Sequence, residues 1–144
     1  MKLYADSSLL ISYYVNDSNS VNAQAVIHAA TAPLPFTGLH RLEMRNALAL
    51  GVFRRLLSPA QVNAAWSDLE RDVRSGRLFP QPVNWTSVYR WAAQWAALHS
   101  PVTGCRSLDV LHVTLAKKLD VQEFFTFDVR QKSMALALAM TVKP

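Results

Sequence analysis

Four carboxylates of this sequence stand in unusually apolar surroundings. Asp6 follows the run "MKLYA", Asp128 follows "FFTF", Glu43 lies in "LHRLEMRNAL" and Asp109 lies in "RSLDVLHVTLA". A charge beside a buried strand or helix face is costly unless a partner compensates it. Carboxylates that share one site either take up protons or bind a cation, so these residues predict a divalent metal site.

Electrostatic repulsion indicates which ion such a site would take. Two carboxylates ~5 Å apart repel by about 3 kcal/mol at an effective dielectric constant of 20, and four of them repel in every pair. Mg²⁺ or Mn²⁺, each a hard ion with oxygen ligands, relieves that repulsion, and Mg²⁺ keeps several waters while it bridges to substrate phosphate. An ion of this kind lowers the pKa of a bound water and stabilises charge on a scissile phosphate, which predicts in-line hydrolysis.

Each carboxylate also has an explanation that needs no metal. Asp6 and Asp128 both precede an expected helix, where Asp is a favoured N-cap, although Ser7 and Ser8 can cap the first helix equally well. The metal interpretation of these two aspartates therefore depends on the presence of the other acidic residues.

The other two carboxylates differ in their local partners. Asp109 falls in the first turn of its helix, three residues after Arg106, and an ion pair between them is the alternative to a metal role. Glu43 points roughly 160° away from both Arg41 and Arg45 on an ideal helix, so neither arginine neutralises it. An exposed surface position is the alternative for Glu43.

The elements that position these residues follow from hydrophobic periodicity and from capping signals. Short strands are expected at 2–5, 33–38, 77–83, 123–127 and 140–143. Helices are expected at 7–15, 21–30, 39–52, 59–75, 85–98, 106–119 and 130–139, with a turn at 100–105. The clearest signal is "SPAQ", in which Ser58 is the N-cap, Pro59 the first helical residue and Gln61 the partner in a capping box.

Strands that alternate with helices predict an α/β fold with a parallel sheet covered on both faces. Ligands of such sheets bind beyond the carboxyl ends of the strands. Asp6 and Asp128 occupy two of these ends, so we expect them to face a ligand crevice.

Four segments in this order resemble the PIN-domain ribonucleases, in particular the VapC-type toxins of type II toxin–antitoxin modules. They are "YADSSLLI", "LHRLEMRNAL", "LDVLHVTLA" and "FFTFDVRQ". The resemblance covers nearly the whole chain, while 53–104 carries no matching motif. It implies a single PIN-like domain over 1–144, a three-layer α/β/α sandwich with a parallel sheet of about five strands in the order 3-2-1-4-5. It also implies that Asp6, Glu43, Asp109 and Asp128 are the catalytic residues that bind Mg²⁺ or Mn²⁺.

The resemblance implies an RNA substrate, a cognate antitoxin protein and a homodimer. Fifteen Lys and Arg against ten acidic residues give a net charge of +5, which favours a polyanionic partner. Arg106, Arg130 and Lys132 are candidate RNA contacts, with solvated surface charge as the alternative. Ser7 and Thr126 are candidates to orient the metal ligands, or else are structural.

Bulk properties limit the remaining possibilities. A length of 144 residues with 51% hydrophobic composition fits one globular domain. Cys105 is the single cysteine, which excludes an internal disulfide and fits a reducing cytoplasm. Neither a signal peptide nor a membrane span is expected, because charges interrupt every apolar run before ~18 residues.

Other functions fit the sequence less well. An aspartyl-phosphate phosphatase needs a second Asp two residues after the first, and a receiver domain needs paired acids near its N-terminus; "MKLYADSS" supplies neither. A PIN-like module that binds nucleic acid or protein without catalysis is the alternative that we keep. His112 is expected to be a core histidine, and Trp91, Trp95 and Leu98 are expected to pack in the core, with a protein interface second.

Overall fold

The computed structural model describes residues 2–144 and confirms an α/β fold with parallel strands. The strands are β1 (Leu3–Ala5), β2 (Leu34–Phe36), β3 (Leu78–Pro80), β4 (Glu123–Phe125) and β5 (Thr141–Lys143). The helices are α1 (Ser7–Tyr14), α2 (Ser20–Ala29), α3 (Gly38–Phe53), α4 (Pro59–Ser75), α5 (Trp85–Thr103), α6 (Ser107–Lys118) and α7 (Val129–Ala137).

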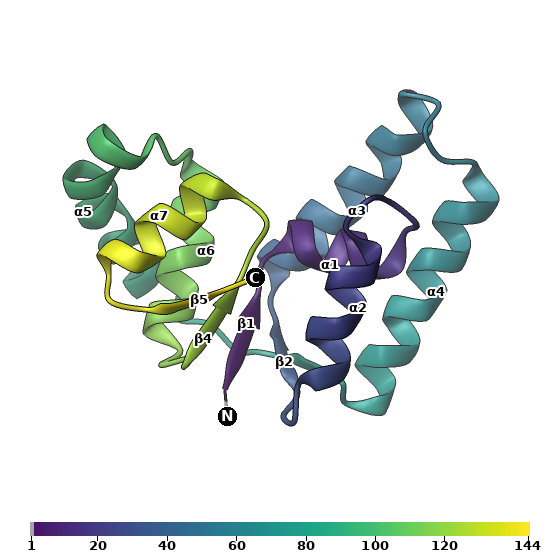
Figure 1. Cartoon of the computed structure of the whole chain (residues 1–144), viewed down its shortest axis with the longest axis horizontal. Helices are drawn as coiled ribbons and strands as arrows, with labels where there is room; N and C mark the ends of the chain where they lie inside the picture. The colour runs from purple at the N-terminus through teal and green to yellow at the C-terminus, as the bar shows by residue number, and fades with distance from the viewer. Residues whose placement is uncertain (1) are drawn as a thin grey trace. The chain divides into compact units, whose positions relative to one another are not determined.

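Contacts divide the described residues into two compact units, 2–6 with 82–144 (the first unit) and 7–81 (the second unit). In the first unit β4 pairs in parallel with β1 on one side and β5 on the other, as Figure 1 shows. Helices α5, α6 and α7 pack against one another beside these strands. Tyr4 stacks on Phe124 across the β1–β4 pair, and both side chains are fully buried.

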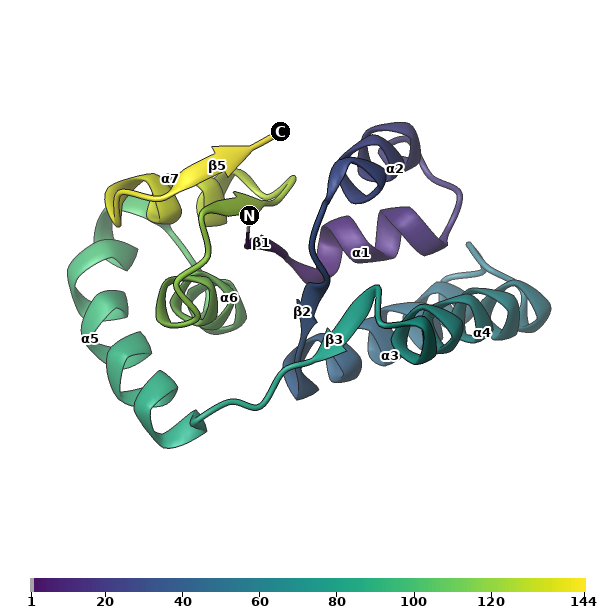
Figure 2. The same cartoon turned by 90° about the horizontal axis from the view of Figure 1, so that it is seen from below.

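The second unit contains the parallel pair β2–β3 and helices α1 to α4. Figure 2 shows α3 and α4 running side by side, and α1 packs against α2, α3 and α4. Its core contains Leu9, Phe36, Met44, Leu48 and Leu69. The order β1-β4-β5 in the first unit and β2-β3 in the second both agree with the expected 3-2-1-4-5 sequence of strands.

The capping signals at 58–61 work as expected. Ser58 Oγ accepts from Gln61 N at 3.1 Å, and Gln61 Oε1 accepts from Ser58 N at 2.7 Å. At the other end of α4, Gly76 adopts a left-handed φ of 82°, a conformation that side chains with a Cβ disfavour. The chain therefore turns sharply from α4 into β3.

Two local expectations were wrong. The expected turn at 100–105 is mostly helix, because α5 continues through Pro101 and ends only at Gly104, which is left-handed. Proline fits a helical φ and removes one hydrogen bond in the last turn, so glycine decides the end. The fourth strand stops at Phe125 instead of continuing through Phe127.

The start of α1 agrees with the helix expected at 7–15. It begins at Ser7, so Ser7 and Ser8 lie in its first turn and Asp6 takes the position before it. A serine inside the first turn directs its hydroxyl to other partners, and Ser7 does so in the candidate site described below.

Candidate functional site

Asp6 and Thr126 lie opposite each other where β1 and β4 end. The strand register sets Ala5 against Phe125, and Asp6 N donates to Phe125 O at 3.0 Å. Thr126 Oγ1 then donates to Asp6 Oδ2 at 2.8 Å. Asp6 is 0% exposed and Thr126 is also buried, so this hydrogen bond fixes a carboxylate that solvent does not reach.

Asp128 is the N-cap of α7. Its Oδ1 accepts from Arg130 N at 2.8 Å and from Gln131 N at 2.9 Å, which bears out the capping alternative. Its own N–H donates to Thr126 Oγ1 at 2.9 Å, so the Thr126 hydroxyl joins Asp128 to Asp6. Both capping bonds use Oδ1, so capping leaves the second oxygen of Asp128 available to another ligand.

Asp109 lies in the first turn of α6 and is 6% exposed. Its Oδ2 accepts from Arg106 N at 3.0 Å and from Arg106 Nε at 3.3 Å, so the expected pairing with Arg106 is present. Its Oδ1 accepts from Gln131 Nε2 at 3.0 Å. Oδ2 thus accepts two hydrogen bonds from Arg106, whereas Oδ1 accepts one from Gln131 and keeps a further lone pair.

These contacts connect three carboxylates of the first unit in one network: Asp6 to Thr126, Thr126 to Asp128, Asp128 to Gln131 and Gln131 to Asp109. The sequence reasoning gave Gln131 no role. Its spacing from Asp128 was a usable signal, because a cap followed three residues later by Glu or Gln is typical of a helix start. Here the glutamine side chain reaches Asp109 instead of closing a box on the cap.

Glu43 belongs to α3 in the second unit. Ser7 Oγ donates to Glu43 Oε1 at 3.2 Å, which gives Ser7 the kind of contact expected of it. Arg41 pairs with Glu70, and the guanidinium of Arg45 stacks on Trp66 at 4.2 Å from the ring centroid. Both arginines thus have partners other than Glu43.

The donor set of the network suits a hard cation. Its acidic members offer carboxylate oxygens only, and no His or Cys takes part. Within residues 2–144, no three His, Cys, Asp or Glu side chains come together as a ready coordination group. Mg²⁺ commonly takes one or two protein carboxylates and completes its octahedron with water and substrate, so these residues fit that ion.

Basic groups lie next to the network. Arg106 and Arg130 are exposed, and Lys132 Nζ donates to Pro144 O at 3.2 Å. Cys105 Sγ donates to Arg130 O at 3.1 Å, and burial raises the pKa of the Cys105 thiol. A raised pKa disfavours the thiolate, which argues against a cysteine nucleophile here.

Two other candidates have structural roles or different surroundings. His112 is buried, and its Nδ1 lies 2.7 Å from Tyr4 Oη, so the expectation of a core histidine is confirmed.

The core expectation for the α5 stripe was wrong, because Trp91 is 37% and Leu98 is 68% exposed. Lys118 Nζ covers the Trp91 ring at 4.7 Å, and Trp95 lies beside Trp91, so this apolar stripe is a surface feature.

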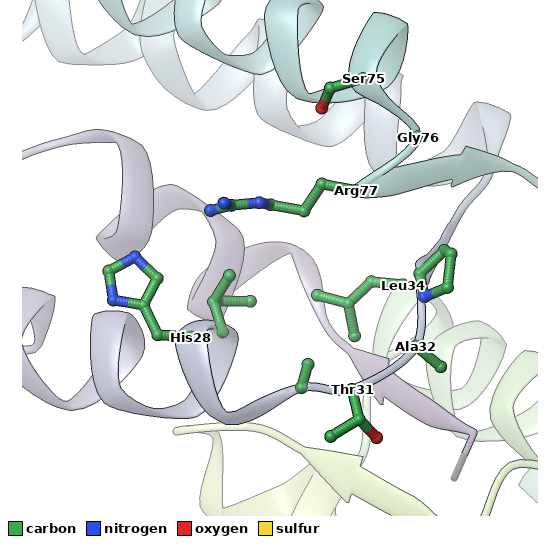
Figure 3. A pocket seen from close by; sticks show the side chains of 10 residues that line it. His28, Thr31, Ala32, Leu34, Ser75, Gly76 and Arg77 are labelled. Atoms are coloured by element: carbon green, nitrogen blue, oxygen red, sulfur yellow. The ribbon is translucent and has the colours of Figure 1, made fainter.

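A cavity of about 620 Å³ lies in the second unit, and the described residues that line it are not members of the network. It is bordered by the C-terminal ends of α2 and α4, and Figure 3 shows the Arg77 side chain extending across it toward His28. Arg77 is already occupied, since it donates to Tyr13 Oη at 2.6 Å and lies 3.9 Å from Asp72 Oδ1. Among the described residues that line the cavity there is no carboxylate, and the guanidinium of Arg77 already has partners.

The chain is similar along almost its whole length to solved structures. One is VapC20 from Mycobacterium tuberculosis, described as a sarcin–ricin loop cleaving toxin, with 17% identity and a TM-score of 0.71 over 99% of this chain and 100% of that one. Another is FitAcB from Neisseria gonorrhoeae, with 18% identity and a TM-score of 0.67 over 99% of this chain and 96% of that one. This likeness establishes the fold and confirms that it is PIN-like.

Comparison by sequence adds no relative, because no protein-family model and no curated protein matches the chain. None of the helices in the described range 2–144 combines the length and the apolarity that crossing a membrane requires.

Proposed function

We propose that this protein is a metal-dependent endoribonuclease, the toxin of a toxin–antitoxin pair, and that it hydrolyses RNA phosphodiester bonds. The observation that carries the proposal is the network in which Thr126 and Gln131 connect the carboxylates of Asp6, Asp109 and Asp128, and which begins with Asp6 and Thr126 where β1 and β4 end. Ligands of parallel sheets bind at these strand ends. The full-length likeness to VapC20, an RNA-loop cleaving toxin by its description, supports the same reading.

Glu43 is the fourth acidic residue of the proposed site. Ser7 follows Asp6 directly in the sequence, and its hydroxyl donates a hydrogen bond to Glu43 Oε1. One pair of consecutive residues therefore supplies a carboxylate and the donor that holds a second carboxylate. We propose on this ground that Glu43 acts with Asp6, and that residues 1–144 work as a single domain.

Asp6, Glu43, Asp109 and Asp128 would hold Mg²⁺ or Mn²⁺. When bound, such an ion lowers the pKa of a coordinated water and stabilises negative charge on the scissile phosphate. The side chains contribute orientation: Thr126 holds Asp6 Oδ2, and Arg106 and Gln131 hold the two oxygens of Asp109. Preorganised ligands reduce the reorganisation that accompanies the reaction.

RNA binding is assigned to Arg106, Arg130 and Lys132, three cationic residues beside the network. The net charge of +5 favours approach of a polyanion. Arg106 has a second task, because its guanidinium pairs with Asp109. It would thus contact phosphate and orient a metal ligand at the same time.

A cognate antitoxin and a second copy of the chain are the proposed protein partners. The exposed apolar residues of α5 are not packed in the core, which favours α5 as a contact surface for a protein partner. Light scattering of the purified protein at micromolar concentration, and co-purification with the product of a neighbouring reading frame, test these partners. A monodisperse monomer with no such partner would count against both.

The function is tested by incubating the protein with total bacterial RNA and with a sarcin–ricin loop hairpin, in Mg²⁺, Mn²⁺ or EDTA. Asp6→Asn should bind the metal less tightly and abolish cleavage without unfolding the protein. Asp68→Asn is the matched control, because Asp68 is half-exposed, is not a member of the network and pairs with Arg71 on its own helix. Undiminished cleavage in excess EDTA or by Asp6→Asn would refute the mechanism.

The alternative is a PIN-like module that binds nucleic acid or protein without catalysis. The ion pair between Arg106 and Asp109 favours it to a degree, since a cationic side chain already satisfies one of the carboxylates. A calorimetric titration with Mn²⁺ separates the two. A nuclease that binds the ion through the four carboxylates gives a heat of binding that Asp6→Asn removes. A module without catalysis gives the same signal with and without this substitution.

A further inference from the structure

Gln131 contacts both carboxylates that α6 and α7 supply to the first unit. Its backbone N–H donates to Asp128 Oδ1 at 2.9 Å, and its side-chain Nε2 donates to Asp109 Oδ1 at 3.0 Å. The residue is only 5% exposed. A neutral amide orients the two carboxylates without placing a positive charge next to a cation site.

The other end of the same side chain is unusual. Gln131 Oε1 is shielded from solvent and has no hydrogen-bond partner among the described residues. Its orientation is defined by chemistry, because a flipped amide would set its oxygen against the Asp109 carboxylate. Buried acceptors are nearly always satisfied, and an exception beside a cluster of acids indicates a donor that is not part of the chain.

We propose that Gln131 is a positioning residue of the metal site. Its amide nitrogen holds Asp109, its backbone holds Asp128, and its carbonyl oxygen accepts a hydrogen bond from a water at the ion. This inference rests on the proposed function and adds one residue to it. Groups that orient metal ligands typically contribute about 10–100-fold to metal affinity.

The experiment compares Gln131→Met with Gln94→Met. Methionine is unbranched and of similar length, but it neither donates nor accepts a strong hydrogen bond. Gln94 is exposed on α5, a helix that carries no residue of the network. The Mn²⁺ dissociation constant of the RNA-free protein and the melting temperature in EDTA are measured for both variants and for the parent.

We expect Gln131→Met to weaken Mn²⁺ binding by about tenfold or more. Its melting temperature in EDTA should change by less than about 5 °C, because the lost hydrogen bond to Asp109 is offset by removal of the unsatisfied carbonyl oxygen. Gln94→Met should match the parent in both measurements. Gln131→Asn, whose amide is one methylene too short to reach Asp109, should weaken Mn²⁺ binding in the same direction.

The outcomes separate this inference from the proposed function. If the parent binds Mn²⁺ and a folded Gln131→Met or Gln131→Asn protein binds it equally well, the role of Gln131 is refuted and the nuclease proposal stands. If Gln131→Met and Gln131→Asn are both unfolded in EDTA, Gln131 is structural and the inference fails. If the parent binds no Mn²⁺, the proposed function fails and takes this inference with it.

Discussion

Thr126 Oγ1 and Asp6 Oδ2 form a buried hydrogen bond of 2.8 Å between residues 120 positions apart in the sequence. The same hydroxyl oxygen accepts from Asp128 N. A threonine immediately after β4 therefore orients the carboxylate that follows β1 and the loop that leads to the cap of α7. This relationship makes Thr126 as informative a target as the aspartates themselves.

The first prediction contrasts two buried threonines. Thr126→Val removes a donor to Asp6 and an acceptor for Asp128 N–H, so it should destabilise the protein by about 1–3 kcal/mol and weaken Mn²⁺ binding. Thr114→Val should be neutral or stabilising, because Thr114 Oγ1 is buried without a hydrogen-bond partner in the described structure. Urea unfolding in EDTA measures both; equal losses of stability in the two variants would contradict the assignment.

The second prediction contrasts Asp128→Asn with Asp109→Asn in the absence of metal. Asn caps helices about as well as Asp, so Asp128→Asn should keep its stability within about 0.5 kcal/mol while it loses metal affinity. Asp109→Asn also weakens the charge-assisted bonds from Arg106 and Gln131, so it should be the less stable variant.

These two variants are compared by thermal melting in EDTA and by Mn²⁺ titration. Relief of repulsion among the remaining acids acts in the opposite direction and limits the loss in both. A more stable Asp109→Asn than Asp128→Asn would show that this repulsion outweighs the hydrogen bonds. Glu43→Gln belongs in the same series and should lose metal affinity, since it removes the charge of the carboxylate that accepts a hydrogen bond from Ser7.

The third prediction concerns RNA. Arg130→Ala should weaken RNA binding and reduce the steepness of its salt dependence, because each phosphate contact releases condensed counterions. Arg90→Ala makes the same charge change at an exposed position of α5 and should have little effect. Fluorescence anisotropy with a single-stranded RNA in EDTA, over a series of salt concentrations, measures the affinity of both variants. An RNA affinity that does not change with salt concentration would refute the electrostatic account.

The fourth prediction concerns alkaline pH. Burial, and then the 2.7 Å hydrogen bond that Tyr14 donates to Asp72, raise the pKa of Tyr14 above its ordinary value of 10.0. The folded state thus retains a proton that the unfolded state loses, so this group's contribution is complete below about pH 10 and declines as pH rises above that value.

Tyr14→Phe should therefore cost about 1–2 kcal/mol near neutral pH and should flatten the fall in stability above about pH 10. Tyr89→Phe is the control, because Tyr89 is exposed. Denaturant unfolding of each variant near pH 8 and near pH 10.5 gives the comparison. An unchanged alkaline slope in Tyr14→Phe would contradict the assigned role of the Tyr14 phenol.

Local signals in the sequence determined the element types well. Alternating strands and helices predicted the α/β class, and "SPAQ" with Gly76 predicted both ends of α4, because capping depends on side chains within three or four residues. The same local rules ended α5 too early, before Pro101. A proline in the last helical turn removes only one hydrogen bond, so the helix continues through it. They also misplaced the α5 stripe, because a helical period shows which residues share a face and not what that face meets.

The candidate site likewise combines features that are local in the sequence with contacts that depend on the tertiary structure. The four acids were recognisable from the sequence because charges in apolar surroundings are rare, and the cap position of Asp128 and the pairing of Asp109 with Arg106 are local. Only the tertiary structure could reveal that Thr126 donates a hydrogen bond to Asp6 and that Gln131 donates one to Asp109. Each contact depends on how two elements distant in sequence pack together. Strand register sets Asp6 against Thr126, and the packing of α7 on α6 brings the amide of Gln131 to Asp109.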